Sequence, residues 1–405
     1  MTTLQDQLTL PNGTILANRI AKSAMSENLS NKTHEPTPVL INAYKKWAKS
    51  GSGLLITGNV MIDSKALGEP MNVVVEDKRH FEKLQEWANS VQETDTQLWV
   101  QINHPGRQAM DQINSVLKAP SAIPLKSKGR KKATTKIPEA LTHEEIEDII
   151  KRFGTTAAIL KEAGFGGVQI HGAHGYLVSQ FLSPYANVRK DDWGGSLEKR
   201  ARFVLEVYKE IRKQVGADFP IGIKLNSADF QKGGFSEEDS IKVIELLSEA
   251  GIDLIEISGG TYEAPAMMMG NRKQSTKERE AYFIDYIEKA RAITKTPLML
   301  TGGFRTVSVM QEAIASEELD VVGLARPFTL FPNIGNEILE ESRTNFGVNI
   351  NKTGVKGIDG MMNIIWYEAQ IKRLGLGKKP NLKLSAWSVF FNYLFLIFKF
   401  KLTRK

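Results

Sequence analysis

Apolar runs typical of buried β-strands alternate with amphipathic, helix-like patterns along most of this chain. The helical patterns place apolar residues three and four apart, as at Ile146, Ile149 and Phe153. The pattern contains eight such units, each a strand followed by a helix. This number predicts a (β/α)8 TIM barrel, a fold of the α/β class. The strands are expected at residues 20–25, 53–61, 98–103, 167–170, 221–225, 254–258, 298–301 and 321–324.

Cysteine is absent from the 405 residues, which excludes disulfides, Cys-ligated zinc and iron–sulfur clusters. With 41% hydrophobic and 24% charged residues, the composition is that of a soluble globular protein. The first ten residues lack the basic segment and apolar core of a secretory signal. We therefore expect a cytoplasmic protein.

The formal charge of +7 is concentrated at the C-terminus, because residues 368–405 hold nine Lys or Arg and one acidic residue. A second basic run lies within the long loop 105–141. No aromatic residues interleave with these loop charges, which argues against a nucleic-acid partner. The loop charges are Lys126, Lys128, Arg130, Lys131, Lys132 and Lys136.

The C-terminal region differs from the barrel pattern, so we expect a barrel over residues 1–345 and a C-terminal helical extension with a basic, apolar tail over 346–405. The segment from Trp387 to Phe400 contains five Phe residues. As a helix it would span roughly 21 Å, too short for the roughly 30 Å of bilayer hydrocarbon. Docking on the barrel or a partner subunit, and peripheral contact with an anionic membrane surface, both remain open. An oligomer is also compatible with the sequence.

The stretch from Gly166 to Phe203 carries the most chemistry. An apolar strand ends there in His171, His174 and Tyr176, and barrel active sites lie at such strand ends. Taken alone, these rings could equally cap the strand for structural reasons. However, HGAHGYLVSQFLSP followed by N-x-R-x-D-x-W-G-G-S-x-E-x-R-x-R-F resembles the old yellow enzyme family of FMN-dependent oxidoreductases.

This resemblance implies catalytic roles for the three residues. His171 and His174 would donate hydrogen bonds to the oxygen of a bound carbonyl or nitro compound and stabilise its developing negative charge. Tyr176 would then protonate the α-carbon, since a phenol of pKa about 10 is a usable acid toward an enolate. A zinc site would need a third ligand, and we predict no metal.

The resemblance also implies tightly bound FMN. In the stretch NRIAKSAMS, the backbone of Ser23, Ala24 and Met25 would lie against the flavin, and Ser26 would contact its reactive edge. Taken alone, Ser26 is more simply a polar strand end. Gly58 would let the ring approach the backbone closely.

Two further polar residues are expected at the flavin ring. Gln101, in QINHPGR, offers a donor and an acceptor that suit the pyrimidine edge, although it could be an ordinary buried amide. Lys224 stands where the family usually has Arg, near flavin N1 and O2. Lys keeps the charge but loses the bidentate geometry of Arg.

The phosphate of FMN is expected between the last two strands, where barrels commonly bind phosphate. Gly302 and Gly303 follow the seventh strand, and Ala325 and Arg326 follow the eighth. The glycines permit close backbone approach, and Arg326 supplies charge-assisted hydrogen bonds. Ser258, Gly259 and Gly260, after the sixth strand, either line the same cavity or turn the chain.

Gly164–Gly167 precedes a strand, so it does not form a dinucleotide-binding turn. NADH or NADPH is therefore expected as a transient reductant that reaches the flavin as a substrate. We predict an FMN-dependent NAD(P)H oxidoreductase that reduces an electron-poor small molecule, such as an activated alkene, by ping-pong hydride transfer. The alternatives are a quinone, nitro-compound or flavin reductase without a carbon-acid step, and a non-catalytic barrel that binds a phosphorylated ligand.

Overall fold

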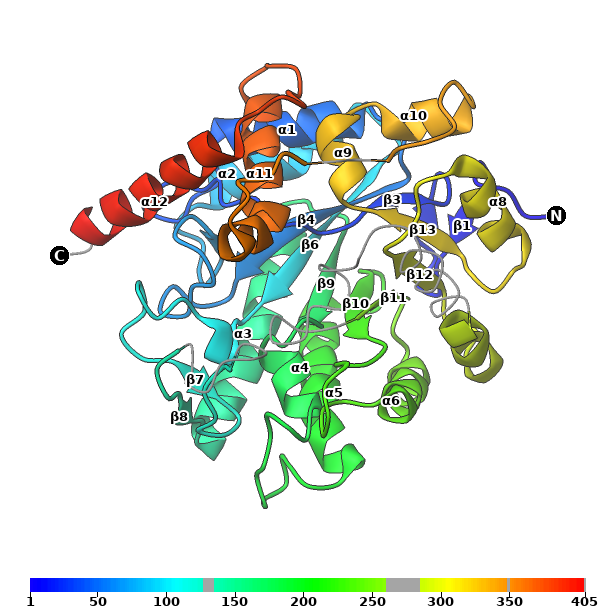
Figure 1. Cartoon of the computed structure of the whole chain (residues 1–405). Coiled ribbons are helices and arrows are strands. Elements are labelled where there is room, and N and C mark those ends of the chain that lie inside the picture. Colours follow the sequence, from blue (N-terminus) through cyan, green and yellow to red (C-terminus); the bar gives the residue numbers. More distant parts are fainter. Residues whose placement is uncertain (127–134, 260–284, 348–349, 404–405) are drawn as a thin grey trace.

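A computed structural model describes residues 1–126, 135–259, 285–347 and 350–403, and Figure 1 shows strands surrounded by helices. Eight parallel strands form a closed barrel, because β13 pairs with β3 and β3 pairs with β4. The predicted (β/α)8 fold is thus confirmed. The barrel strands are β3 (Ile20–Lys22), β4 (Leu54–Met61), β6 (Gln97–Asn103), β9 (Gly167–Gly172), β10 (Ile221–Asn226), β11 (Leu254–Ser258), β12 (Leu298–Thr301) and β13 (Val321–Leu324).

The first strand is shorter than expected, since it ends at Lys22 and not at Met25. Ser23 still donates its N–H to the carbonyl of Leu324 at 2.9 Å, and the residues that follow leave the sheet. A short strand, β5 (Val73–Val74), adds to the edge of β4.

Helices cover the outside of the barrel. The longest, α3, begins with a capping box in which Thr142 and Glu145 bond each other's backbone N–H, and it buries Ile146, Ile149 and Phe153. The helices are α1 (Pro38–Ala48), α2 (Phe81–Ala88), α3 (His143–Glu162), α4 (Leu177–Leu182), α5 (Leu197–Val215), α6 (Glu237–Ala250), α8 (Val307–Ala315), α9 (Arg326–Leu330) and α10 (Ile334–Leu339). The short pair β7 (Lys118–Ala119) and β8 (Glu139–Ala140) lies in the long loop after β6.

The interior of the barrel is apolar at its amino-terminal end. An antiparallel hairpin of β1 (Leu8–Thr9) and β2 (Ile15–Leu16) packs there against Trp99 and neighbouring strand residues. Gly167 leaves room for the indole, because a Cβ at this position would be 2.7 Å from it. The closed bottom leaves the carboxyl ends of the strands as the place for a site.

Two helices, α11 (Lys356–Gly375) and α12 (Ala386–Thr403), form the C-terminal extension. Helix α11 packs against α1 and α9, and Trp366 belongs to a small apolar core that also contains Val389 of α12. On this packing we propose residues 346–405 as a unit attached to the barrel of residues 1–345. Within the described ranges, no helix combines the length and apolarity needed to cross a membrane.

Candidate active site

The three predicted catalytic rings lie together at the carboxyl end of β9. The ring of His171 is 5.2 Å from that of His174 and 4.6 Å from that of Tyr176, measured between centroids. The rings of His171 and Tyr176 are nearly perpendicular, at 89°. His171 and Tyr176 are both buried. The structure therefore brings these residues into one cluster, as the sequence predicted.

His174 is held by the ends of the next two strands. Its backbone lies in the left-handed region, with φ of 60°, and its N–H donates to Oδ1 of Asn226 at 3.1 Å. Its Nε2 shares a hydrogen bond of 2.7 Å with Oγ of Ser258. These contacts from β10 and β11 fix the ring, and they assign Ser258 to the site.

Both histidines are neutral. Burial lowers the pKa of His174 to about 3, and the positive charge of Lys224 acts in the same direction. The pKa of His171 also lies well below its usual value. Burial is the largest cause, and His174 and Lys224 lower this pKa further. Among the described residues, nothing pairs with Nδ1 of His171, although the side chain is only 3% exposed. An unpaired buried polar atom costs about 1–3 kcal/mol, which suits a position that binds a ligand.

A chain of buried side chains crosses the barrel below these rings. Gln101 donates from Nε2 to Oε1 of Gln169 at 2.7 Å, and Gln169 donates from Nε2 to Oε2 of Glu256 at 2.6 Å. The other carboxylate oxygen of Glu256 lies 3.0 Å from Nζ of Lys224. The side chains of Gln101 and Lys224 are thus joined in one buried network, and both are engaged within the protein.

Glu256 also connects this network to the start of the barrel. Thr301 donates its hydroxyl to Oε1 of Glu256 at 2.6 Å, and the hydroxyls of Thr301 and Ser23 are 2.6 Å apart. A Cβ on Gly323 would lie 2.1 Å from Oγ1 of Thr301, so only glycine fits there. Sequence reasoning missed Glu256 and Gln169, although both occupy inward positions of predicted strands.

Ser26 binds two glutamates. Its Oγ lies 2.6 Å and 2.5 Å from the two carboxylate oxygens of Glu69 and 2.7 Å from Oε1 of Glu368 in α11. Burial raises the pKa of Glu69, and burial together with the charge of Glu69 holds that of Glu368 well above its usual value. We call Glu69 and Glu368 the carboxyl pair. Through Ser26, the pair connects the extension to the segment after β3.

Ala24, Met25 and Gly58 are close-packed. Ala24 packs against the apolar cluster inside the barrel, while Met25 contacts the apolar core of the extension. A Cβ at Gly58 would be 2.3 Å from the carbonyl oxygen of Met25. The glycine is thus required by the protein's own backbone.

The predicted phosphate end lies on the neighbouring strands β12 and β13. Gly302 and Gly303 have φ of 132° and 87°, conformations that favour glycine. Arg326 directly follows Ala325, and its guanidinium lies 5.6 Å from the ring of Tyr367 in α11. Burial raises the pKa of Tyr367, while the charges of Arg326 and Arg305 oppose this rise. Arg305, not assigned to the site from sequence, therefore adds a second cation.

These residues fit FMN. Two glycines with positive φ and two guanidinium groups suit a phosphate, and the unpaired Nδ1 of His171 is available to a bound group within the described part of the site. Gly260 and four of the loop charges, Lys128, Arg130, Lys131 and Lys132, lie outside the described residues.

Comparisons with known proteins identify relatives of this chain. A model of the NADH:flavin oxidoreductase / NADH oxidase family matches residues 7–345. An NADH-dependent flavin oxidoreductase of Hypocrea jecorina (iliE) is 36% identical over 354 residues, which cover 82% of this chain and 88% of that protein.

Two solved structures extend the comparison. A 2-naphthoyl-CoA reductase in complex with 2-naphthoyl-CoA has a TM-score of 0.76 at 26% identity and matches 84% of this chain. The match spans 52% of that longer chain. An old yellow enzyme homologue from Zymomonas mobilis shares the fold, with a TM-score of 0.71 at 22% identity, over 85% of this chain and 94% of its own.

Proposed function

Because the chain belongs to the NADH:flavin oxidoreductase / NADH oxidase family and is an FMN-dependent NAD(P)H oxidoreductase, we propose that it reduces an electron-poor alkene by ping-pong hydride transfer. The observation that carries the proposal is the cluster of Tyr176 against His171, with Nδ1 of His171 unpaired among the described residues. The match to a 2-naphthoyl-CoA reductase supports it. Bound FMN would supply the hydride chemistry that links NAD(P)H to the acceptor.

His171 orients the acceptor in this proposal. A neutral ring with its proton on Nδ1 donates a hydrogen bond to the acceptor's oxygen and stabilises the negative charge that develops there. The low pKa values keep both rings neutral at physiological pH. Because Nε2 of His174 is bonded to Ser258, only Nδ1 of this ring is left to contact the acceptor as long as the bond persists.

Tyr176 supplies the proton. Its ring lies against His171 at the same end of β9, so a substrate oxygen at His171 places the α-carbon near the phenol. General acid catalysis of this kind contributes about 10²–10⁴-fold. The carboxyl pair and the Lys224–Glu256 pair would hold the surrounding shell in place.

Anaerobic mixing experiments test the proposed acceptor. The FMN-loaded protein is first reduced with NADH or NADPH and then mixed with an enone, a quinone or a nitro compound. We expect the enone to reoxidise the flavin and yield the saturated ketone. Reoxidation by the quinone or nitro compound alone would refute alkene reduction and favour an enzyme without a carbon-acid step.

A further inference from the structure

Helix α12 has two different apolar faces. One face is buried: Ala386 and Val389 pack on α11, and Phe400 packs against residues that follow β4 and β6. The opposite face carries large apolar side chains that are 41–66% exposed. Their spacing of four, three, one, three and four places them on one side of the helix. They are Trp387, Phe391, Leu394, Phe395, Phe398 and Leu402.

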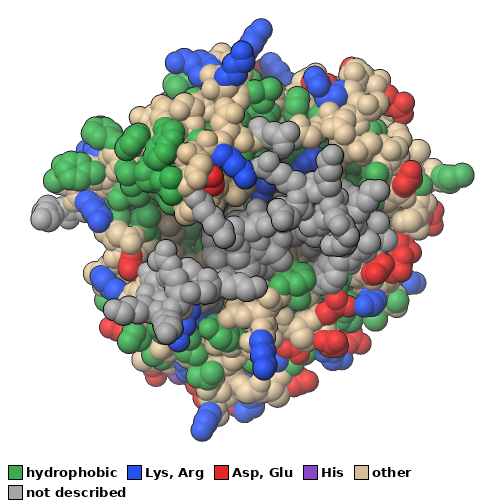
Figure 2. Space-filling view, in the orientation of Figure 1, with side chains coloured by type: hydrophobic (Ala, Val, Ile, Leu, Met, Phe, Trp, Pro, Cys, Tyr) green, Lys and Arg blue, Asp and Glu red, His purple; other side chains and the backbone are tan. Residues whose placement is uncertain are grey.

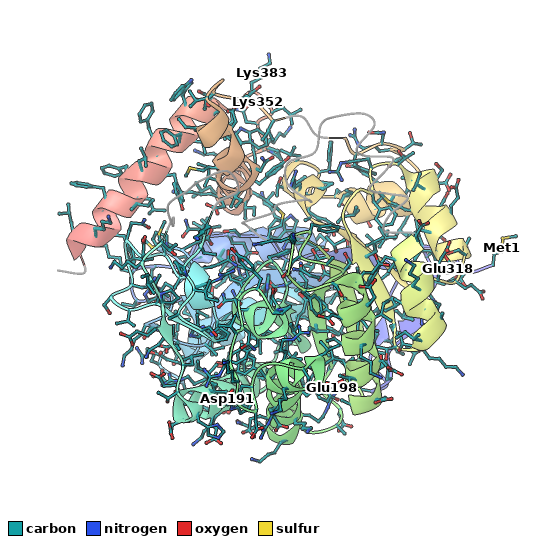
Figure 3. All side chains as sticks on the ribbon, turned by 60° about the horizontal axis from the view of Figure 1, so that its bottom comes forward. Met1, Asp191, Glu198, Glu318, Lys352 and Lys383 are labelled. Atoms are coloured by element: carbon teal, nitrogen blue, oxygen red, sulfur yellow. The ribbon has the colours of Figure 1, made fainter. Side chains whose placement is uncertain are left out.

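This outer face forms a continuous apolar surface. In Figure 2, hydrophobic side chains gather at the upper left edge of the molecule, where Figure 1 draws α12. Figure 3 shows side chains of α12 that project away from the barrel. Clustered exposed apolar side chains of this size mark a binding surface.

The helix is fixed in its orientation, so the outer face cannot turn inward without breaking contacts. Trp366 donates from Nε1 to the carbonyl of Leu384 at 3.0 Å, just before α12 begins. Gln370 and Asn381 exchange two hydrogen bonds of 2.8 and 2.9 Å. Phe400 anchors the far end among Met61 and its neighbours.

The charges that α12 and the loop before it carry are all positive. The sequence has no acidic residue after Glu368. The lysines of this region are exposed, and none forms an ion pair within the described part of the chain. Figure 3 shows Lys383 close to the start of α12, together with Lys352. The exposed lysines from α11 onward are Lys372, Lys378, Lys379, Lys383, Lys399 and Lys401.

We propose that the outer face of α12 binds the surface of an anionic lipid bilayer, with its aromatic side chains among the lipids and its lysines at the headgroups. A helix whose apolar face is accompanied only by basic residues of its own segment has the pattern of one that lies in the bilayer interface. A second copy of the chain is disfavoured, because pairing through α12 would bring two basic tails together without an acid to neutralise them. The helix is not suited to crossing the bilayer.

Vesicle sedimentation of the full-length, FMN-loaded protein tests the proposal. Vesicles of phosphatidylcholine with a quarter phosphatidylglycerol are expected to bind the protein, and more weakly at high salt. Pure phosphatidylcholine should bind it less. Equal recovery in the supernatant with both vesicle types and without vesicles would overturn the proposal.

A triple variant tests whether α12, and not another part of the surface, binds the vesicles. Phe391→Ser/Phe395→Ser/Phe398→Ser removes three exposed rings, so folding and turnover of a soluble acceptor are expected to persist. Vesicle affinity is expected to fall by at least about 100-fold, given the apolar area that each ring would bury. Unchanged affinity would refute the role of α12.

A matched control removes the same number of exposed apolar side chains from the barrel. Ile15→Ser/Ile137→Ser/Val188→Ser changes residues that are 49%, 71% and 59% exposed, and it should bind vesicles like the wild type. Sedimentation velocity without lipid tests the competing occupant. If the wild type is a dimer, the triple variant is a monomer and neither binds vesicles, the outer face of α12 binds a second copy of the chain and not a membrane.

Discussion

The buried pair of Lys224 and Glu256 allows a quantitative test of how the barrel interior is built. Nζ of Lys224 lies 3.0 Å from the carboxylate, and the two side chains are 3% and 0% exposed. Among the described residues, Glu256 is the only carboxylate within ion-pair distance of this ammonium. Glu256→Gln therefore leaves a buried charge without an anionic partner, while an oxygen remains for Thr301 to donate to.

The expected cost is about 3–5 kcal/mol, because removal of one member of a buried ion pair leaves the other charge uncompensated. This is a large part of the about 5–15 kcal/mol that stabilises a typical native protein. Lys224→Met in the same chain removes the orphaned charge, so the double variant should recover at least about 2 kcal/mol relative to Glu256→Gln.

Urea unfolding at saturating FMN, followed by tryptophan fluorescence, measures these free energies once refolding is shown to be reversible. Glu206→Gln is the matched control, because Glu206 pairs with Lys209 on the surface and is expected to contribute less than about 1 kcal/mol. Destabilisation by Glu256→Gln below about 1 kcal/mol, or no recovery in the double variant, would refute the reasoning.

Three further outcomes are expected. The pKa values of the carboxyl pair are raised in the folded protein, so above about pH 4.5 the folded protein holds protons that the unfolded chain has lost. The free energy of unfolding therefore falls as pH rises through the folded pKa values. Glu368→Gln should flatten this decline in Tm; parallel Tm–pH curves would contradict it. Gly323→Ala places a Cβ 2.1 Å from Oγ1 of Thr301 and should lower Tm by several degrees, unlike Gly357→Ala, whose Cβ meets nothing within 4 Å. Arg326→Ala should weaken FMN binding about 10- to 100-fold by fluorescence titration, and an unchanged Kd would remove Arg326 from the phosphate site.

The barrel could be predicted because parallel strands buried on both faces are continuous apolar runs. All eight predicted strands overlap an observed one. The first strand was overextended to Met25, because the apolar pattern does not show where the ladder ends. That end depends on the pairing of Ser23 with Leu324, a contact between the two ends of the barrel sequence.

The shell around the site was less predictable. Gln101 and Lys224 were found through a family motif, whereas Gln169 and Glu256 gain meaning only when the strand register brings them together. Ser26 and Glu368 are separated by 342 residues, and no local pattern indicates that they meet. The inner and outer faces of α12 likewise depend on how α11 packs, since the helix is apolar on nearly all sides.

The half-reactions of Tyr176→Phe test the central claim most directly. Anaerobic stopped-flow measurements should show flavin reduction by NAD(P)H at the wild-type rate, because Tyr176 has no part in that step. Reoxidation by an enone should be slower by about 10²–10⁴-fold, while Tyr208→Phe, whose hydroxyl donates to the carbonyl of Gly251 in another part of the chain, should leave both rates unchanged. Enone reoxidation of Tyr176→Phe at the wild-type rate would contradict the account.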